Sequence, residues 1–171
     1  YNVEPTRYGI GSTALDMLKH GNYNNMELTL LLLADRLQHI KQLKQLGNDI
    51  VVVMDRFMLC TWAYQGIHVD GSEKIIDAVH QSIVNDLGKD HIHNILLDVE
   101  PIIAFNRMVN RKRKMDATET RGEEFFETVR EVYLVEITNP MFNKGYIIEC
   151  NEGLDIVKSR LDDVVKNIFE G

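Results

Sequence analysis

The chain has 171 residues, 44% of them apolar and 26% charged, which is enough to bury the core of one globular domain. A net charge of −7 at pH 7 argues against general nucleic-acid and membrane-surface binders, which need a basic face. No apolar run could span a bilayer, and two cysteines, Cys60 and Cys150, make no disulfide framework, so we expect a cytoplasmic protein. The chain starts at Tyr1 and not at a methionine, from which we expect a preceding segment in the complete gene product.

Two helices are predicted in the first third of the chain. After a loop at 4–11, Ser12 is expected to cap a short helix to about His20, and Gly21 with an asparagine-rich stretch then ends it. From residue 26 to 46, apolar residues recur at helical spacing. The apolar stripe is wide, so we expect this helix to be buried on two sides, by its own sheet and by a second subunit.

Continuous apolar runs predict strands that are covered on both faces. The first run is Ile50–Met54, and Asn94–Val99 and Tyr146–Glu149 repeat the pattern. Strands that alternate with helices predict an α/β fold, a three-layer doubly wound parallel sheet flanked by helices, as one domain over 1–171. The later helices are expected at about 73–87, 101–113, 118–137 and 153–169.

Asp55 and Arg56 follow directly after the first predicted strand, where ligands bind in this architecture. A carboxylate at such a place can position a metal-bound water in nucleotide-binding folds. The guanidinium beside it can match phosphate oxygens with two parallel donors. A simple ion pair or a turn at the strand end is the alternative interpretation.

Two further segments offer ligand-binding groups. On the long predicted helix, Arg36 follows Leu32 by four residues, so the two side chains share a face and can present a donor and an apolar contact to one ligand. Capping the exposed edge of a core helix would explain Arg36 equally well. The turn-prone "EPTRYG" makes Arg7 and Tyr8 available to an anion.

A basic cluster stands out in this acidic chain, within "RMVNRKRKMDATETRGEEFF". A mobile cationic segment can close over a polyphosphate and stabilise charge in phosphoryl transfer. A solvated helix face or loop is the alternative. His91 and His93 have no third ligand nearby in the sequence, so an exposed edge is expected there and not a metal site.

Taken in order, these segments resemble the thymidylate kinase family of P-loop nucleoside monophosphate kinases. "EPTRYGIG" is similar to its proline-arginine loop and "LLLLADRLQHI" to its base-binding helix. "VVVMDRFMLCTWAYQG" is similar to its aspartate-arginine-aromatic motif, and "NILLDVEP" to its next strand. "RMVNRKRKMDATETRGEEFFETVREVYL" is similar to the lid, about 107–122, and the helix after it. The similarity spans nearly all of the chain and implies a P-loop NTPase fold.

The resemblance implies Mg²⁺-dependent transfer of a phosphoryl group from ATP to a deoxynucleoside monophosphate, with dTMP and dTDP as the expected substrate and product. Arg7 and Arg56 would hold the acceptor's phosphate, and Asp55 would help to place magnesium through a water. The lid cations would meet the ATP phosphates. The implied catalytic residues are Asp55, Arg56, Arg107, Arg111, Lys112 and Arg113.

The same resemblance implies an acceptor pocket, in which Arg36 would bond the pyrimidine base. Tyr64 and Gln65 would line the deoxyribose and base, with Tyr64 disfavouring a ribose 2′-hydroxyl. It also implies small-molecule partners and a homodimer packed through helix 26–46. The implied binding residues are Arg7, Tyr8, Leu32, Arg36, Thr61, Tyr64 and Gln65.

The chain departs from the family pattern in three ways. Leu32 stands where a phenylalanine usually stacks on thymine, and Cys60 and Thr61 replace serines. The phosphate-cradling G-x-x-x-x-G-K-[ST] loop does not occur in the 171 residues. Two alternatives therefore stay open: a kinase for another pyrimidine nucleotide or nucleoside, and a non-catalytic dimeric nucleotide-binding homologue.

Overall fold

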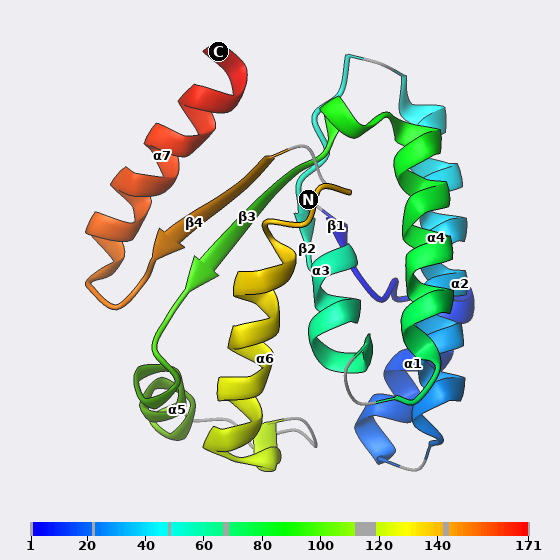
Figure 1. Ribbon diagram of the computed structural model, residues 1–171, viewed down its shortest axis with the longest axis horizontal. Helices are drawn as coiled ribbons and strands as arrows, with labels where there is room; N and C mark the ends of the chain where they lie inside the picture. Colours follow the sequence, from blue (N-terminus) through cyan, green and yellow to red (C-terminus); the bar gives the residue numbers. More distant parts are fainter. Residues whose placement is uncertain are drawn as a thin grey trace. The chain divides into compact units, whose positions relative to one another are not determined.

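The computed structural model describes residues 2–21, 23–47, 49–66, 69–111, 119–141 and 144–170. Contacts divide the chain into two compact units, residues 1–86 and 87–171. They are coloured blue to green and green to red in Figure 1. Each unit has a two-stranded parallel sheet. The expectation of a single domain over 1–171 stays a prediction.

The sheet of the first unit is short. β1 (Asn2–Val3) pairs in parallel with β2 (Met54–Asp55), so that Asn2 lies opposite Met54 and Val3 opposite Asp55. The predicted strand over Ile50–Met54 is therefore wrong for its first four residues, and Val51 and Val53 are exposed. The described part of β1 is two residues long, so it offers backbone partners only to the end of the apolar run.

α1 (Gly9–His20) begins four residues before the position that the sequence predicts, since its N-cap is Tyr8 and not Ser12. Ser12 is not its N-cap, because the Ser12 hydroxyl lies inside the helix and donates to the Gly9 carbonyl oxygen at 2.7 Å. Gly9 has φ +55°, a conformation that lets the chain turn into the helix early. The predicted end is confirmed, since Gly21 follows in the left-handed conformation and donates to the Met17 carbonyl oxygen.

α2 (Asn25–Leu43) confirms the long helix, and a 3₁₀ turn, Lys44–Leu46, continues it. The Asn24 side chain accepts from the Met26 amide at 2.8 Å, and Glu27 accepts from the Asn24 amide at 3.3 Å. This capping box satisfies amides that the first turn leaves without helical partners. The N-terminus of α2 is thus fixed by local sequence.

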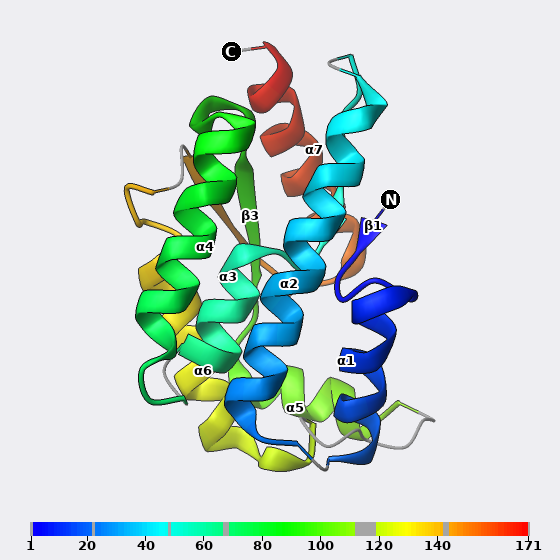
Figure 2. The same ribbon diagram turned by 90° about the vertical axis from the view of Figure 1, so that its right-hand side faces the viewer.

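Two further helical segments complete the first unit. α3 (Met58–Thr61) runs into a π-helical turn, Trp62–Gly66, and α4 (Ser72–Leu87) lies beside α2 (Figures 1 and 2). Lys44 and Asp86 form an ion pair at the ends of the two long helices. The buried apolar side chains of this unit are Ala14, Leu28, Leu33, Ile40, Met58, Leu59, Ala63, Ile76, Ile83 and Val84.

In the second unit, β3 (His93–Asp98) pairs in parallel with β4 (Lys144–Glu149) over six residues. Both predicted strands are confirmed to within two residues. α5 (Pro101–Val109) packs on α6 (Glu123–Glu136), and α7 (Leu154–Glu170) packs along β4 (Figure 1). Parallel strands joined through helices confirm the α/β class. None of the helices in the described ranges is long and apolar enough to cross a membrane.

Candidate active site

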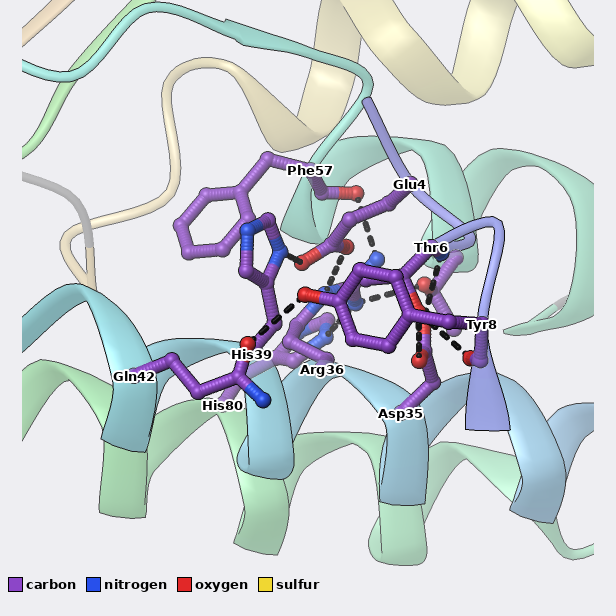
Figure 3. A network of polar contacts seen from close by, with 10 residues as sticks. Glu4, Thr6, Tyr8, Asp35, Arg36, His39, Gln42, Phe57 and His80 are labelled. Carbon is purple, nitrogen blue, oxygen red and sulfur yellow. Dashed lines mark hydrogen bonds and ion pairs between the residues drawn. The ribbon is translucent and has the colours of Figure 1, made fainter. Parts of the chain in front are cut away.

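Arg36 on α2 is the centre of a buried polar network in the first unit (Figure 3). The whole residue is 3% exposed. Its Nε donates to Glu4 Oε2 at 2.6 Å, and its Nη1 donates to Thr61 Oγ1 at 2.7 Å. Its Nη2 donates to the Phe57 carbonyl oxygen at 3.1 Å. The guanidinium is thereby held from several directions by charge-assisted hydrogen bonds.

His80 on α4 supplies a further contact to the same guanidinium. Its Nε2 lies 3.1 Å from Arg36 Nη1, and because a guanidinium has no acceptor, Nε2 must accept and the ring proton must sit on Nδ1. The ring is fully buried. Burial and the charge of Arg36 lower the pKa of His80 from 6.5 to about 3, so the imidazole is neutral. Nδ1 has no hydrogen-bond partner among the residues that the structure describes.

Glu4 neutralises the buried charge of Arg36 from the loop after β1. Its carboxylate is buried and accepts from Arg36 through Oε2, while Oε1 lies 3.4 Å from His39 Nδ1. Breaking a buried pair of this kind leaves one charge without compensation in the interior. Glu4, Arg36, His39, Phe57, Thr61 and His80 are called the Arg36 cluster below.

Two more residues of the loop that carries Glu4 form hydrogen bonds to α2 (Figure 3). Thr6 donates from its amide to Asp35 Oδ2 at 2.7 Å and from its hydroxyl to Asp35 Oδ1 at 2.6 Å. Tyr8 donates from its hydroxyl to Gln42 Oε1 at 2.7 Å. Arg7 lies between these two anchored residues and is exposed. Its backbone position is therefore fixed while its side chain can meet a ligand.

Asp55 and Arg56 are exposed at the carboxyl end of β2. Arg56 has φ +70°, a left-handed conformation that costs a non-glycine residue about 1–2 kcal/mol. Its guanidinium carbon lies 5.3 Å from the centroid of the Tyr64 ring, within cation–π range. Strained backbone of this kind is concentrated at functional sites.

Tyr64 and Gln65 lie in the π-helical turn Trp62–Gly66, a local form that is frequent at functional sites. Thr61, one residue earlier, is buried against Arg36. Leu32 lies one turn before Arg36 on α2 and is partly buried. Two pairs of predicted site residues are therefore in contact in the first unit. Arg36 donates to Thr61, and the Arg56 guanidinium lies near the Tyr64 ring.

The predicted lid cations belong to the second unit. Arg107 on α5 is exposed, and its Nη2 lies 3.3 Å from the Asn151 carbonyl oxygen and 3.4 Å from that of Glu152. Arg111 is also exposed. Lys112 and Arg113 lie outside the described residues, so the predicted lid stays a prediction.

Several of the polar residues that build this site were not predicted from the sequence. Glu4, His39 and His80 were not expected to take part, and neither were Thr6 and Asp35. One signal was available, since polar residues stand on α2 at positions that a wide apolar stripe would bury. No sequence pattern pointed to His80, which stands on another helix.

Magnesium is the metal that the resemblance implies. No group of three His, Cys, Asp or Glu side chains within the described ranges could hold a metal ion. Magnesium is commonly held by one or two carboxylates together with waters and substrate phosphates. Asp55 offers an exposed carboxylate at the end of β2, which fits that pattern.

A groove of about 310 Å³ lies between α2 and α4, away from these residues. It is formed by the second half of each helix, and none of the predicted site residues lines it. The groove therefore does not mark the predicted acceptor site. Its lining residues are Leu37, Ile40, Lys41, Lys44, Ser82, Ile83 and Asp86.

Comparisons with known proteins agree on one family. The thymidylate kinase family model matches residues 1–161. Thymidylate kinase from Legionella pneumophila is 30% identical over 175 residues, covering 98% of this chain and 79% of that protein. Thymidylate kinase from Coprothermobacter proteolyticus is 31% identical over 146 residues, covering 84% and 72%. The solved structure of thymidylate kinase from Candida albicans matches with a TM-score of 0.67 and 17% identity, over 97% of this chain and 78% of that one, and supports the fold.

Proposed function

Because this chain belongs to the thymidylate kinase family, we propose that it catalyses the ATP-dependent phosphorylation of dTMP to dTDP. The observation that carries the proposal is the Arg36 cluster, a fixed and buried guanidinium in the same compact unit as the exposed pair Asp55–Arg56. The first can read a base, and the second can bind a phosphate.

Arg36 would donate to a carbonyl oxygen of the pyrimidine base. Its protein partners hold it rigidly, so little side-chain entropy is lost when the base binds. Leu32, one turn earlier on the same helix, would give the base an apolar contact in place of an aromatic stack. Selectivity would then depend more on hydrogen bonding than on stacking.

The acceptor's sugar and phosphate would lie along the exposed residues of the same unit. Arg7 and Arg56 would bind the phosphate through their forked donors. Tyr64, whose ring is held near Arg56, would pack on the deoxyribose and disfavour a 2′-hydroxyl, with Gln65 beside it. Tyr8 would border this site, with its hydroxyl already bound to Gln42.

Phosphoryl transfer would depend on positioning and charge neutralisation, with no covalent enzyme intermediate. Arg56 and the lid cations Arg107, Arg111, Lys112 and Arg113 would stabilise negative charge on the moving phosphoryl group. Asp55 would orient a water bound to Mg²⁺, and when bound the ion would neutralise phosphate charge. Each of these residues would hold charge in place and form no bond to phosphorus.

Composition and the exposed residues of α2 support two proposals, on location and on assembly. We propose a cytoplasmic enzyme whose partners are small nucleotides and not nucleic acid, which a net charge of −7 supports. We also propose a homodimer that packs through helix 26–46. Leu30 and Leu37, two turns apart on α2, are 47% and 43% exposed and would be covered in such a dimer. Analytical ultracentrifugation would test this by measuring the mass of the wild type and of Leu30→Glu in solution. We expect the wild type to be a dimer and the variant to be a monomer.

The test of the activity is ADP release from MgATP by the complete gene product, with and without dTMP. Release that depends on dTMP is expected. Parallel reactions with dUMP, dCMP and thymidine would identify a different acceptor. Binding of dTMP without any ADP release would contradict the kinase and favour the non-catalytic homologue.

A further inference from the structure

We propose that His80 is a positioning residue for Arg36, and that its contact decides how strongly the enzyme prefers an acceptor base with a carbonyl oxygen. This inference rests on the proposed function. His80 would touch no substrate and would act only through the guanidinium. α4 carries none of the predicted site residues, so the inference adds this helix to the acceptor site.

The N–H groups of the Arg36 guanidinium explain why the contact with His80 matters. A guanidinium has five N–H groups in a rigid plane. Nε–H is bound by Glu4, the two Nη1 hydrogens by Thr61 and His80, and one Nη2 hydrogen by the Phe57 carbonyl oxygen. Among the described residues, the second Nη2 hydrogen has no acceptor, and under the proposed function it would be the one that binds the base. Because the group is planar, the four bound hydrogens fix the direction of the fifth.

His80 can be tested apart from the other three partners. Glu4, Phe57 and Thr61 come from the segments that also carry the predicted phosphate-binding and sugar-binding residues, so replacing them would disturb several contacts at once. His80 comes from the interior of α4, and among the described residues its polar contact with the site is the one to Arg36 Nη1. A change at His80 therefore alters the guanidinium with the least effect on the rest of the site.

The state of the ring suits an acceptor. His80 is fully buried and its pKa is lowered to about 3, first by burial and then by the charge of Arg36. Nε2 is thus unprotonated at any pH near neutrality. The buried Nδ1–H without a described partner is a cost that an apolar residue would not carry. The contact with Arg36 is what the ring supplies and an apolar residue would lack.

Three substitutions separate positioning from packing. His80→Gln can place an amide oxygen where Nε2 lies and so keep the acceptor. His80→Asn is too short to reach Arg36, and His80→Leu fills the space without an acceptor. The measurements are the Kd of dTMP by calorimetry, the KM values of dTMP and ATP, and the kcat/KM ratio of dTMP to dCMP. The last ratio matters because thymine offers an oxygen where cytosine offers an amino group.

We expect His80→Leu and His80→Asn to raise the Kd and KM of dTMP about tenfold, the value of one charge-assisted hydrogen bond. The KM of ATP should stay the same, and the preference for dTMP over dCMP should fall about tenfold. His80→Gln should restore both quantities to within about threefold of the wild type. Unchanged dTMP affinity in His80→Leu, or no recovery in His80→Gln, would overturn the proposal and leave His80 as a packing residue.

A measurement without substrate distinguishes this inference from the proposed function. Nitrogen NMR of the free protein reads the tautomer of His80 and the rotation of the Arg36 guanidinium. An Nδ1–H tautomer with slow rotation, which becomes fast in His80→Leu, would support positioning even if the wild type failed to bind dTMP and the proposed function fell. An Nε2–H tautomer, or equal rotation in both proteins, would overturn it.

Discussion

Replacing His80 should change how the stability of the first unit depends on pH. In the unfolded chain a histidine has a pKa of about 6.5, whereas burial and Arg36 lower the pKa of folded His80 to about 3. At a pH between these two values, His80 binds a proton in the unfolded chain but not in the folded protein. The free energy of unfolding therefore falls as the pH falls, by about 1.4 kcal/mol for each pH unit below 6.5.

From pH 7 to pH 5 this contribution amounts to about 2 kcal/mol. His80→Gln removes the titrating ring. The free energy of unfolding of the wild type, relative to that of this variant, should therefore fall by about 2 kcal/mol from pH 7 to pH 5. Glu4 contacts Arg36 and His39 in both proteins, so comparing wild type with variant largely removes the effect of these two residues.

The assay is urea unfolding at several pH values, followed by tryptophan fluorescence. Trp62 is the only tryptophan in the sequence and lies in the same compact unit as His80. His80→Leu serves as a matched control. The difference in free energy of unfolding between wild type and this variant should change with pH by the same amount, because His80→Leu also removes the ring. A difference between wild type and variants that stays constant within about 0.5 kcal/mol from pH 7 to pH 5 would refute the assignment of a buried neutral imidazole.

Three other substitutions test the fold and the site. Arg56→Gly and Arg56→Ala should abolish phosphoryl transfer equally, whereas the glycine variant should be about 1 kcal/mol more stable in urea, because only glycine accepts φ +70° without strain. Asp98→Asn should destabilise the second unit by about 1–3 kcal/mol in thermal unfolding, since Arg130 donates to both Asp98 oxygens at 2.7 and 2.8 Å and would lose a charged partner; an unchanged midpoint would contradict this. Gly11→Ala should unfold α1 in circular dichroism, because a Cβ there would overlap the Thr6 carbonyl oxygen; a native spectrum would count against the packing described.

The pH dependence of the Asp98–Arg130 pair has the same sign as that of His80 for a different reason. The hydrogen bond from Arg130 lowers the pKa of Asp98 below its ordinary value of 3.8. Its contribution is complete above pH 3.8 and is lost as the pH falls through the lowered value. This pair therefore contributes little to a loss of stability near pH 5, where His80 does contribute.

Local sequence was sufficient where one segment contains its own determinants. The apolar runs of β3 and β4 were predicted to within two residues, and the long apolar stripe predicted α2. It failed for Ile50–Val53, because a strand also needs a partner. Local sequence also misled at Ser12. Serine is a good capping residue, but Gly9 lets α1 begin before Ser12.

The sequence by itself determined the α/β class, the thymidylate kinase resemblance and the expectation that Arg36 and the pair Asp55–Arg56 belong to the site. Only the tertiary structure decided what holds Arg36, because its partners Thr61, Glu4 and His80 are 25, 32 and 44 residues away along the chain. Periodicity and capping act within one or two turns, whereas a buried charge must find its counter-charge and acceptors wherever packing places them.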